Sequence, residues 1–231
     1  MPYRERMPRD TLTKEQIIRT AIELLDEEGL DGLNMRALGK RLGAAATAVY
    51  WHVKNKDDLL LLAGDRVWDE IGLPDPGAAG WRAAATTMAT GLHAMLGRHP
   101  WLVQAFGSHL FYGPGKARHD DHSLAVYEAA GFTGTQADRA AATVFTFVMG
   151  AVLGASATVS LRRRLGRNGA DAEALIQDTV ARAGEVAMGF PRLRARLETP
   201  PALDYAAAPD RTFEYGLEAL LDGLEARLPG A

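Results

Sequence analysis

Hydrophobic residues recur at intervals of three and four along most of the chain, which is the period of an amphipathic α-helix. The longest uninterrupted patterns of this kind cover residues 135–165 and 210–228. No segment shows the short alternating runs, bounded by hairpin turns, that a β-sheet requires. The pattern therefore predicts an all-α fold.

Two short predicted helices follow a longer first one near the beginning of the chain. Thr13 and Gln16 have the spacing of a capping box, so the first helix is expected to begin there. The short helices cover residues 35–42 and 46–53 and are joined by a turn that contains Gly43. This arrangement is typical of a helix-turn-helix, in which the second helix, about 46–53, reads DNA.

A break in the helical pattern divides the chain. Residues 73–80 contain two prolines and two glycines, the composition of a linker or a tight loop between helices. We therefore expect an N-terminal three-helix domain, residues 1–72, and a larger helical domain, residues 77–231.

The composition excludes several kinds of chemistry. The 231 residues include no cysteine, so disulfides, thiolate metal sites and cysteine nucleophiles are ruled out, and a reducing cytoplasm is the expected location. The apolar stretch 140–161 contains five Ser and Thr residues, which favours a buried helix over a membrane span. We therefore expect no membrane partner.

The charge is distributed unevenly. The chain has a net charge of -3, yet residues 34–56 carry five basic residues and no acidic one. A basic stripe on an acidic protein is typical of a surface that faces phosphates. The alternative is a solvated face, although such faces usually mix both signs.

The segment around the second short helix contains Leu42-Gly43, Leu59-Leu60 and, between them, the run Thr47-Ala48-Val49-Tyr50-Trp51-His52-Val53-Lys54-Asn55-Lys56. By these motifs, and above all by the long run, the first 70 residues resemble the tetracycline repressor (TetR) family of bacterial transcription regulators. This resemblance implies a homodimeric repressor that binds double-stranded DNA at an inverted-repeat operator and is released by a small-molecule effector.

The resemblance also implies which residues contact DNA: Arg36, Ala46, Thr47, Ala48, Tyr50, Trp51, His52 and Lys56. The family's name-giving repressor has a glutamine where this chain has Ala46, and alanine offers a base only a methyl contact, so the operator should differ. Tyr50 and Trp51 could instead belong to the core of the small domain.

The larger domain is implied to bind the effector and to form the dimer. Candidate interface residues are Gly150, Gly154, Leu217, Leu221 and Leu224, although the glycine pair could equally form a packing notch within one chain. Candidate pocket residues are Met88, Leu92, Met95, Trp101, Phe106, His109, Phe111, Phe145, Phe147 and Met149, many of which could be ordinary core. Such a lining suits a largely apolar organic effector with few polar anchors.

Known polar contacts of the family's tetracycline site are missing from this chain. The positions that match polar contacts hold Gly72 and Met88, and a matching aromatic position holds Leu92, so neither tetracycline nor magnesium is expected. His109, His119 and His122 with their neighbouring aspartates lack a convincing metal spacing, and Ser108 has no nucleophile elbow. We expect no cofactor, no metal and no enzymatic activity; the alternative to a repressor is a helical small-molecule carrier or interaction module.

Overall fold

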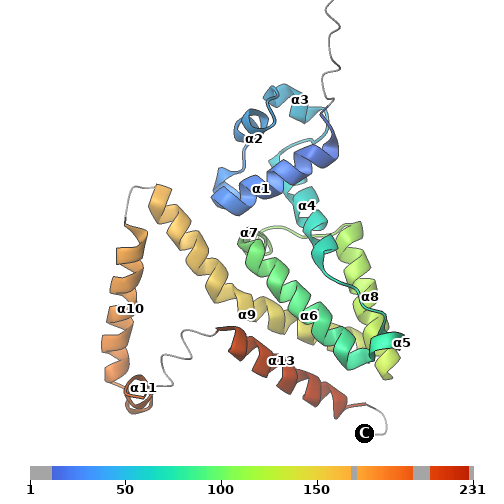
Figure 1. Ribbon diagram of the computed structural model, residues 1–231, viewed down its shortest axis with the longest axis vertical. Helices are drawn as coiled ribbons and strands as arrows, with labels where there is room; N and C mark the ends of the chain where they lie inside the picture. Colours follow the sequence, from blue (N-terminus) through green and yellow to red (C-terminus); the bar gives the residue numbers. More distant parts are fainter. Residues whose placement is uncertain (1–11, 168–170, 200–208, 229–231) are drawn as a thin grey trace, which may run out of the picture.

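The computed structural model describes residues 12–167, 171–199 and 209–228, and within these ranges it contains helices and no strand (Figure 1). Their order is α1 (Lys14–Gly32), α2 (Met35–Arg41), α3 (Ala46–Tyr50), α4 (Lys56–Arg66), the 3-10 turn η1 (Val67–Glu70), α5 (Pro76–Ala79), α6 (Trp81–Arg98), α7 (Pro100–Ala105), α8 (Pro114–Ala130), α9 (Thr135–Arg167), α10 (Ala172–Met188), α11 (Pro191–Leu197) and α13 (Pro209–Glu225). The all-α prediction is confirmed.

Side-chain caps fix the beginnings of the N-terminal helices. The Thr13 hydroxyl accepts a hydrogen bond from the Gln16 backbone N–H at 3.2 Å, and the Gln16 side chain accepts from the Thr13 backbone N–H at 2.9 Å. Asn34 caps α2 through the Ala37 N–H, and Asn55 caps α4 through the Asp58 N–H. Each bond satisfies a donor that a helix N-terminus leaves unpaired.

Two glycines allow α2 and α3 to approach each other. A Cβ atom on Gly39 would lie 2.8 Å from the Ala44 carbonyl oxygen, and Gly43 has a φ of 61°, which favours glycine. We predicted that α3 extends to residue 53, but it ends at Tyr50. Residues 51 and 52 form a turn, and Asn55, which caps α4, has extended backbone.

The larger part of the chain is a layered helical assembly in which α6, α8 and α9 enclose a common core (Figure 1). α7 and the beginning of α8 pack against α1 and α4, so one connected hydrophobic core runs across the expected boundary at residues 72–77. α13 covers the lower ends of α6 and α9. The division into two domains remains a prediction.

α9 is the longest helix and is buried along one line only. Ala137, Ala140, Val144, Val148 and Val152 face the core, whereas Leu153 on the opposite side is 60% exposed. Its most apolar eighteen-residue window has a mean hydropathy of 1.9 and is 22% buried within the chain, so length and composition alone would let it cross a membrane. The stretch 140–161, which we predicted to be a buried helix, is therefore buried on one face, and its other face is exposed in this single chain.

Candidate nucleic-acid interface and internal cavity

Two aromatic side chains project from the end of α3 into solvent. Trp51 is 88% exposed and Tyr50 is 52% exposed, whereas Val49 and Val53 beside them are buried. Aromatic residues of this size normally contribute to a core, so their exposure indicates a binding surface. The alternative that they belong to the small core is not what the structure shows.

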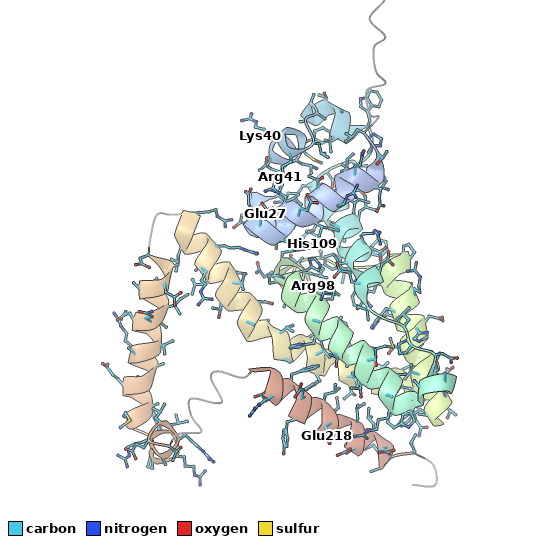
Figure 2. All side chains as sticks on the ribbon, viewed as in Figure 1. Glu27, Lys40, Arg41, Arg98, His109 and Glu218 are labelled. Carbon is cyan, nitrogen blue, oxygen red and sulfur yellow. The ribbon has the colours of Figure 1, made fainter. Side chains whose placement is uncertain are left out.

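The segment around α2 and α3 also carries cations that form no ion pair with a described residue. Arg36, Lys40 and Lys54 are exposed, and within the described residues they form no ion pair. Arg41 is different, because it pairs with Glu27 on α1 (Figure 2). Its hydrogen bond holds the pKa of the Glu27 carboxyl below its usual value. Arg41 therefore stabilises the α1–α2 contact instead of adding to the free positive charge.

Lys56 lies at the beginning of α4, and its ammonium group donates a hydrogen bond to the Leu30 carbonyl oxygen at 2.8 Å. Its side chain remains exposed. Asp57 and Asp58 follow in the first turn of α4 and weaken the positive potential that a bare helix N-terminus would offer to a phosphate. Lys56 itself, more than the helix end, is therefore the cation available at this position.

The other predicted DNA-contacting residues belong to α3 or to the turn after it. Thr47 is exposed, while Ala46, Ala48 and His52 are half-buried. Ala46 is the first residue of α3, and its side chain could offer a base only a methyl contact.

α4 connects this surface to the interior of the larger domain. It begins at Lys56, and Trp68 follows its last turn about 18 Å further along the axis. The Asp65 carboxylate accepts the backbone N–H groups of Gly115 at 3.1 Å and Lys116 at 3.0 Å, which caps the N-terminus of α8. A Cβ atom on Gly115 would lie 2.3 Å from the Asp65 carbonyl oxygen, so only glycine permits this contact.

An internal cavity lies between α6, α8 and α9. Met88 and Leu92 of α6 and Val144 and Phe145 of α9 form its apolar walls. The space left measures about 20 Å³, which suffices for a water molecule and is far below the volume that a drug-sized ligand occupies. An organic ligand would therefore have to open it by moving side chains.

The structure places the ten predicted pocket residues in several different environments. Met88, Leu92 and Phe145 line the cavity, and Phe106 and Phe111 pack 5.0 Å apart behind Phe145. The remaining five lie elsewhere. Trp101 and Met95 are fully buried core, Met149 packs against the core, Phe147 stacks on Phe213 of α13, and His109 approaches Asp57 at 3.7 Å.

Sequence reasoning missed three polar residues that line the cavity. His119, Ser123 and Tyr127 follow one another at intervals of four along α8, so they share one face of that helix. Burial raises the pKa of the Tyr127 hydroxyl well above its ordinary value. The four-residue spacing was visible in the sequence, but the charged neighbours Asp120 and Asp121 pointed to a solvated segment.

The predicted interface residues also divide into two groups. Gly150 and Gly154 are exposed on α9, and a Cβ atom on either would meet nothing within 4 Å. Leu217, Leu221 and Leu224 are buried inside the chain, where α13 packs on α9 and α6. The three leucines therefore hold α13 to its own chain, and a role for them in a dimer interface stays a prediction.

A helix-turn-helix that presents exposed aromatics and cations, joined by a single helix to a cavity-bearing helical domain, defines a DNA-binding transcriptional regulator. Comparison with known families agrees. The family described as bacterial regulatory proteins, tetR family, matches residues 17–63, and the tetracyclin repressor-like C-terminal domain matches residues 73–228. The chain belongs to the TetR family.

Related proteins share this description. An HTH-type transcriptional regulator of Saccharopolyspora erythraea is 36% identical over 65% of this chain and 64% of its own length. The HTH-type transcriptional repressor DrrR1 of Streptomyces coeruleorubidus is 31% identical over 95% of this chain and 80% of its own. The structure of the TetR family protein ActR of Streptomyces coelicolor in complex with actinorhodin superimposes with a TM-score of 0.74 and 28% identity, covering 96% of this chain and 99% of that one.

Proposed function

We propose that this protein is a homodimeric repressor that binds an inverted-repeat operator and leaves it when a small, largely apolar organic effector enters the cavity between α6, α8 and α9. The observation that carries the proposal is the exposed Tyr50–Trp51 pair in a basic segment. That segment leads into α4, and Trp68, which follows α4, contacts His119 and Phe145 of the cavity. Phosphate contacts would come from Lys54, Lys56 and Tyr50.

Base readout would come from the first turns of α2 and α3. Arg36 is the remaining side chain with the geometry to bind guanine bidentately, and Thr47 can reach a base edge. Two copies of α3 would enter successive major grooves, about 34 Å apart, which sets the spacing of the half-sites.

The unpartnered face of α9 supports a dimer. It is long and apolar, and Gly150 and Gly154 would let a second helix approach closely. A second protomer against this face would bury surface that a single chain leaves in contact with water, which is the usual driving force for an obligate dimer. We expect neither a catalytic reaction nor a metal to be needed.

Effector binding would act through α4. Expanding the cavity displaces Phe145 and with it Trp68, which stacks on Phe145 with ring centroids 6.4 Å apart. Because Trp68 follows α4 directly, its movement shifts α4 and changes the separation of the two reading helices. The structure of ActR holds an organic compound, actinorhodin, which supports a ligand-responsive role for this related chain.

A gel-shift titration on the DNA flanking the protein's own gene tests the proposal, with unrelated competitor DNA and two salt concentrations. A repressor is expected to retain this DNA specifically and to lose it as salt rises, because counterions return to the phosphates. If neither this DNA nor a random-sequence pool yields a specific site, the chain is a carrier or interaction module that keeps the fold without reading DNA.

A further inference from the structure

A cleft lies between the C-terminal ends of α1 and α9, which come close together (Figure 1), and it is separate from the cavity between α6, α8 and α9. Its volume is about 280 Å³, close to the lower end of the range for small-molecule pockets. Leu30 of α1 and Ala157 and Leu161 of α9 give it apolar lining, and Gln104 of α7 and Ser160 of α9 add polar groups. The cleft therefore suits a small molecule that is partly apolar and partly polar.

More basic than acidic side chains line this cleft. Its charged lining residues are Glu28, Asp31, Arg163, Arg164 and Arg167. Both carboxylates already have partners, since Asp31 pairs with Arg167 at 2.7 Å and Glu28 lies 3.6 Å from Arg41. Two of the three arginines are therefore left without a carboxylate partner in the described part of the chain.

These two arginines, Arg163 and Arg164, have unused hydrogen-bond donors. The Nη2 atom of Arg163 donates to the Asp26 carbonyl oxygen, but its Nη1 atom is buried and has no hydrogen-bond partner among the described residues. The guanidinium group of Arg164 forms neither a hydrogen bond nor an ion pair within the same residues. A buried donor of a charged group destabilises a protein when it lacks an acceptor, so the pair indicates that an anion binds beside it.

We propose that this cleft binds a small organic carboxylate, whose charged group contacts Arg163 and Arg164 and whose apolar body packs on Leu30 and Leu161. A guanidinium group can bind a carboxylate through two parallel N–H bonds, which a neutral ligand cannot match. Because Arg163 lines the cleft, a turn of its guanidinium group brings the unpaired N–H groups to the ligand. The inference goes beyond the proposed repressor function and does not depend on DNA binding.

A ligand at this position would strengthen the contact between α1 and α9. Arg167 already joins the two helices, because it donates a hydrogen bond to the Glu28 carbonyl oxygen at 2.8 Å and pairs with Asp31. A carboxylate held by Arg164 of α9 with its body on Leu30 of α1 adds a second bridge. Since such a ligand binds only the folded chain, it should also raise the melting temperature.

Benzoate and benzamide test the proposal, because they have nearly the same shape and differ in charge. Isothermal titration calorimetry on the full chain, in phosphate-free buffer and without DNA, is expected to show benzoate binding about tenfold more tightly than benzamide. Saturating benzoate should raise the melting temperature, whereas benzamide at the same concentration should change it little. The proposal is overturned if benzoate does not bind or binds no more tightly than benzamide.

Two variants locate the site. Arg164→Gln removes an exposed charge that has no partner within the described residues, and Ala157→Phe fills the cleft while its arginines stay in place. Each is expected to weaken benzoate binding about tenfold, with an unchanged circular dichroism spectrum. The matched control, Arg139→Gln, removes an exposed arginine near the other end of α9 and should bind benzoate as the unmodified protein does.

The variants can also reject the site. If Arg164→Gln or Ala157→Phe binds benzoate as tightly as the unmodified protein, the carboxylate binds elsewhere and the proposal is overturned. An equal loss of affinity in Arg139→Gln would assign the effect to net charge and would overturn it as well.

Discussion

The Nδ1 atom of His99 lies 2.7 Å from a carboxylate oxygen of Asp26, and its Nε2 atom lies 2.9 Å from one of Glu70. Trp101 donates a second hydrogen bond to the same Asp26 oxygen, and Arg98 donates to Glu70. This network joins α1, which belongs to the N-terminal helix-turn-helix region, to η1 and α7. An imidazole that faces two carboxylates needs both ring protons, so it is held in its charged form.

The bonds of His99 predict that the contact of α1 with η1 and α7 becomes weaker as the pH rises. Burial alone would lower the pKa of His99, but hydrogen bonds to Asp26 and Glu70 and their charges outweigh it, so the pKa lies above its ordinary value of 6.5. A raised pKa in the folded state contributes stability that is fully present below 6.5 and is lost as pH rises through the folded value. The melting temperature should therefore fall over that range.

The variant His99→Gln should remove this pH dependence, because glutamine does not titrate. His122→Gln serves as the control, since His122 makes one bond, to the Pro74 carbonyl, and faces no carboxylate there. Melting curves from about pH 6 to about pH 9 check the expectation. An equal fall in His99→Gln and in the unmodified protein would assign the effect to another group.

Local signals in the sequence predicted the DNA-binding head well. The capping box of Thr13 and Gln16 depends on residues three positions apart, and it forms as expected; the caps at Asn34 and Asn55 are equally local. The break at Gly43 is equally local. The end of α3 was misplaced because a five-residue helix has too few positions for periodicity to define its last turn.

Contacts between distant residues could not be predicted in this way. Asp26 and His99 are 73 positions apart, and nothing near either residue indicates the other. The sequence pattern predicted the apolar face of α13. Periodicity does not say whether such a face packs within its own chain or against a partner, and here Leu217 and Leu221 are buried within their own chain. Which aromatic residues line the cavity depends on the same long-range packing.

Replacing Asp65 by alanine should loosen the connection between α4 and α8. The α8 N-terminus begins at Gly113, which has no side chain to cap it, and the Asp65 carboxylate accepts two of its free N–H groups. Loss of such a cap costs about 1–2 kcal/mol of unfolding free energy. Urea denaturation measures the loss. Asp138→Ala, in the exposed first turn of α9, is the control, and an equal effect of both changes would contradict a specific role for Asp65.

An arginine at Gly154 should prevent dimer formation without unfolding the protomer. A side chain there meets nothing within 4 Å in the single chain, but it would project from the free face of α9. Light scattering after gel filtration is expected to change from the mass of a dimer to that of a monomer. Gly97→Arg, on α6 and equally free of neighbours, should stay dimeric. A dimer that tolerates Gly154→Arg would place the interface elsewhere.

Combining Tyr50→Ala with Lys56→Ala should abolish specific DNA retention. The pair removes one exposed aromatic side chain and one cation for which we propose a phosphate contact, with a combined loss of roughly 2–4 kcal/mol of binding free energy. Because Lys56 also bonds the Leu30 carbonyl, circular dichroism must show that the helical fold is kept. Tyr112→Ala with Arg139→Ala removes the same kinds of group at distant exposed positions and should retain DNA.

The most direct test of the account is the salt dependence of DNA binding, measured by fluorescence anisotropy on the flanking DNA fragment. The logarithm of the affinity is expected to fall linearly with the logarithm of salt concentration, and the slope should decrease by about one in Lys56→Ala, because one phosphate contact is lost. A slope near zero in the unmodified protein, or the same slope in the variant, would contradict the assignment of this surface to DNA.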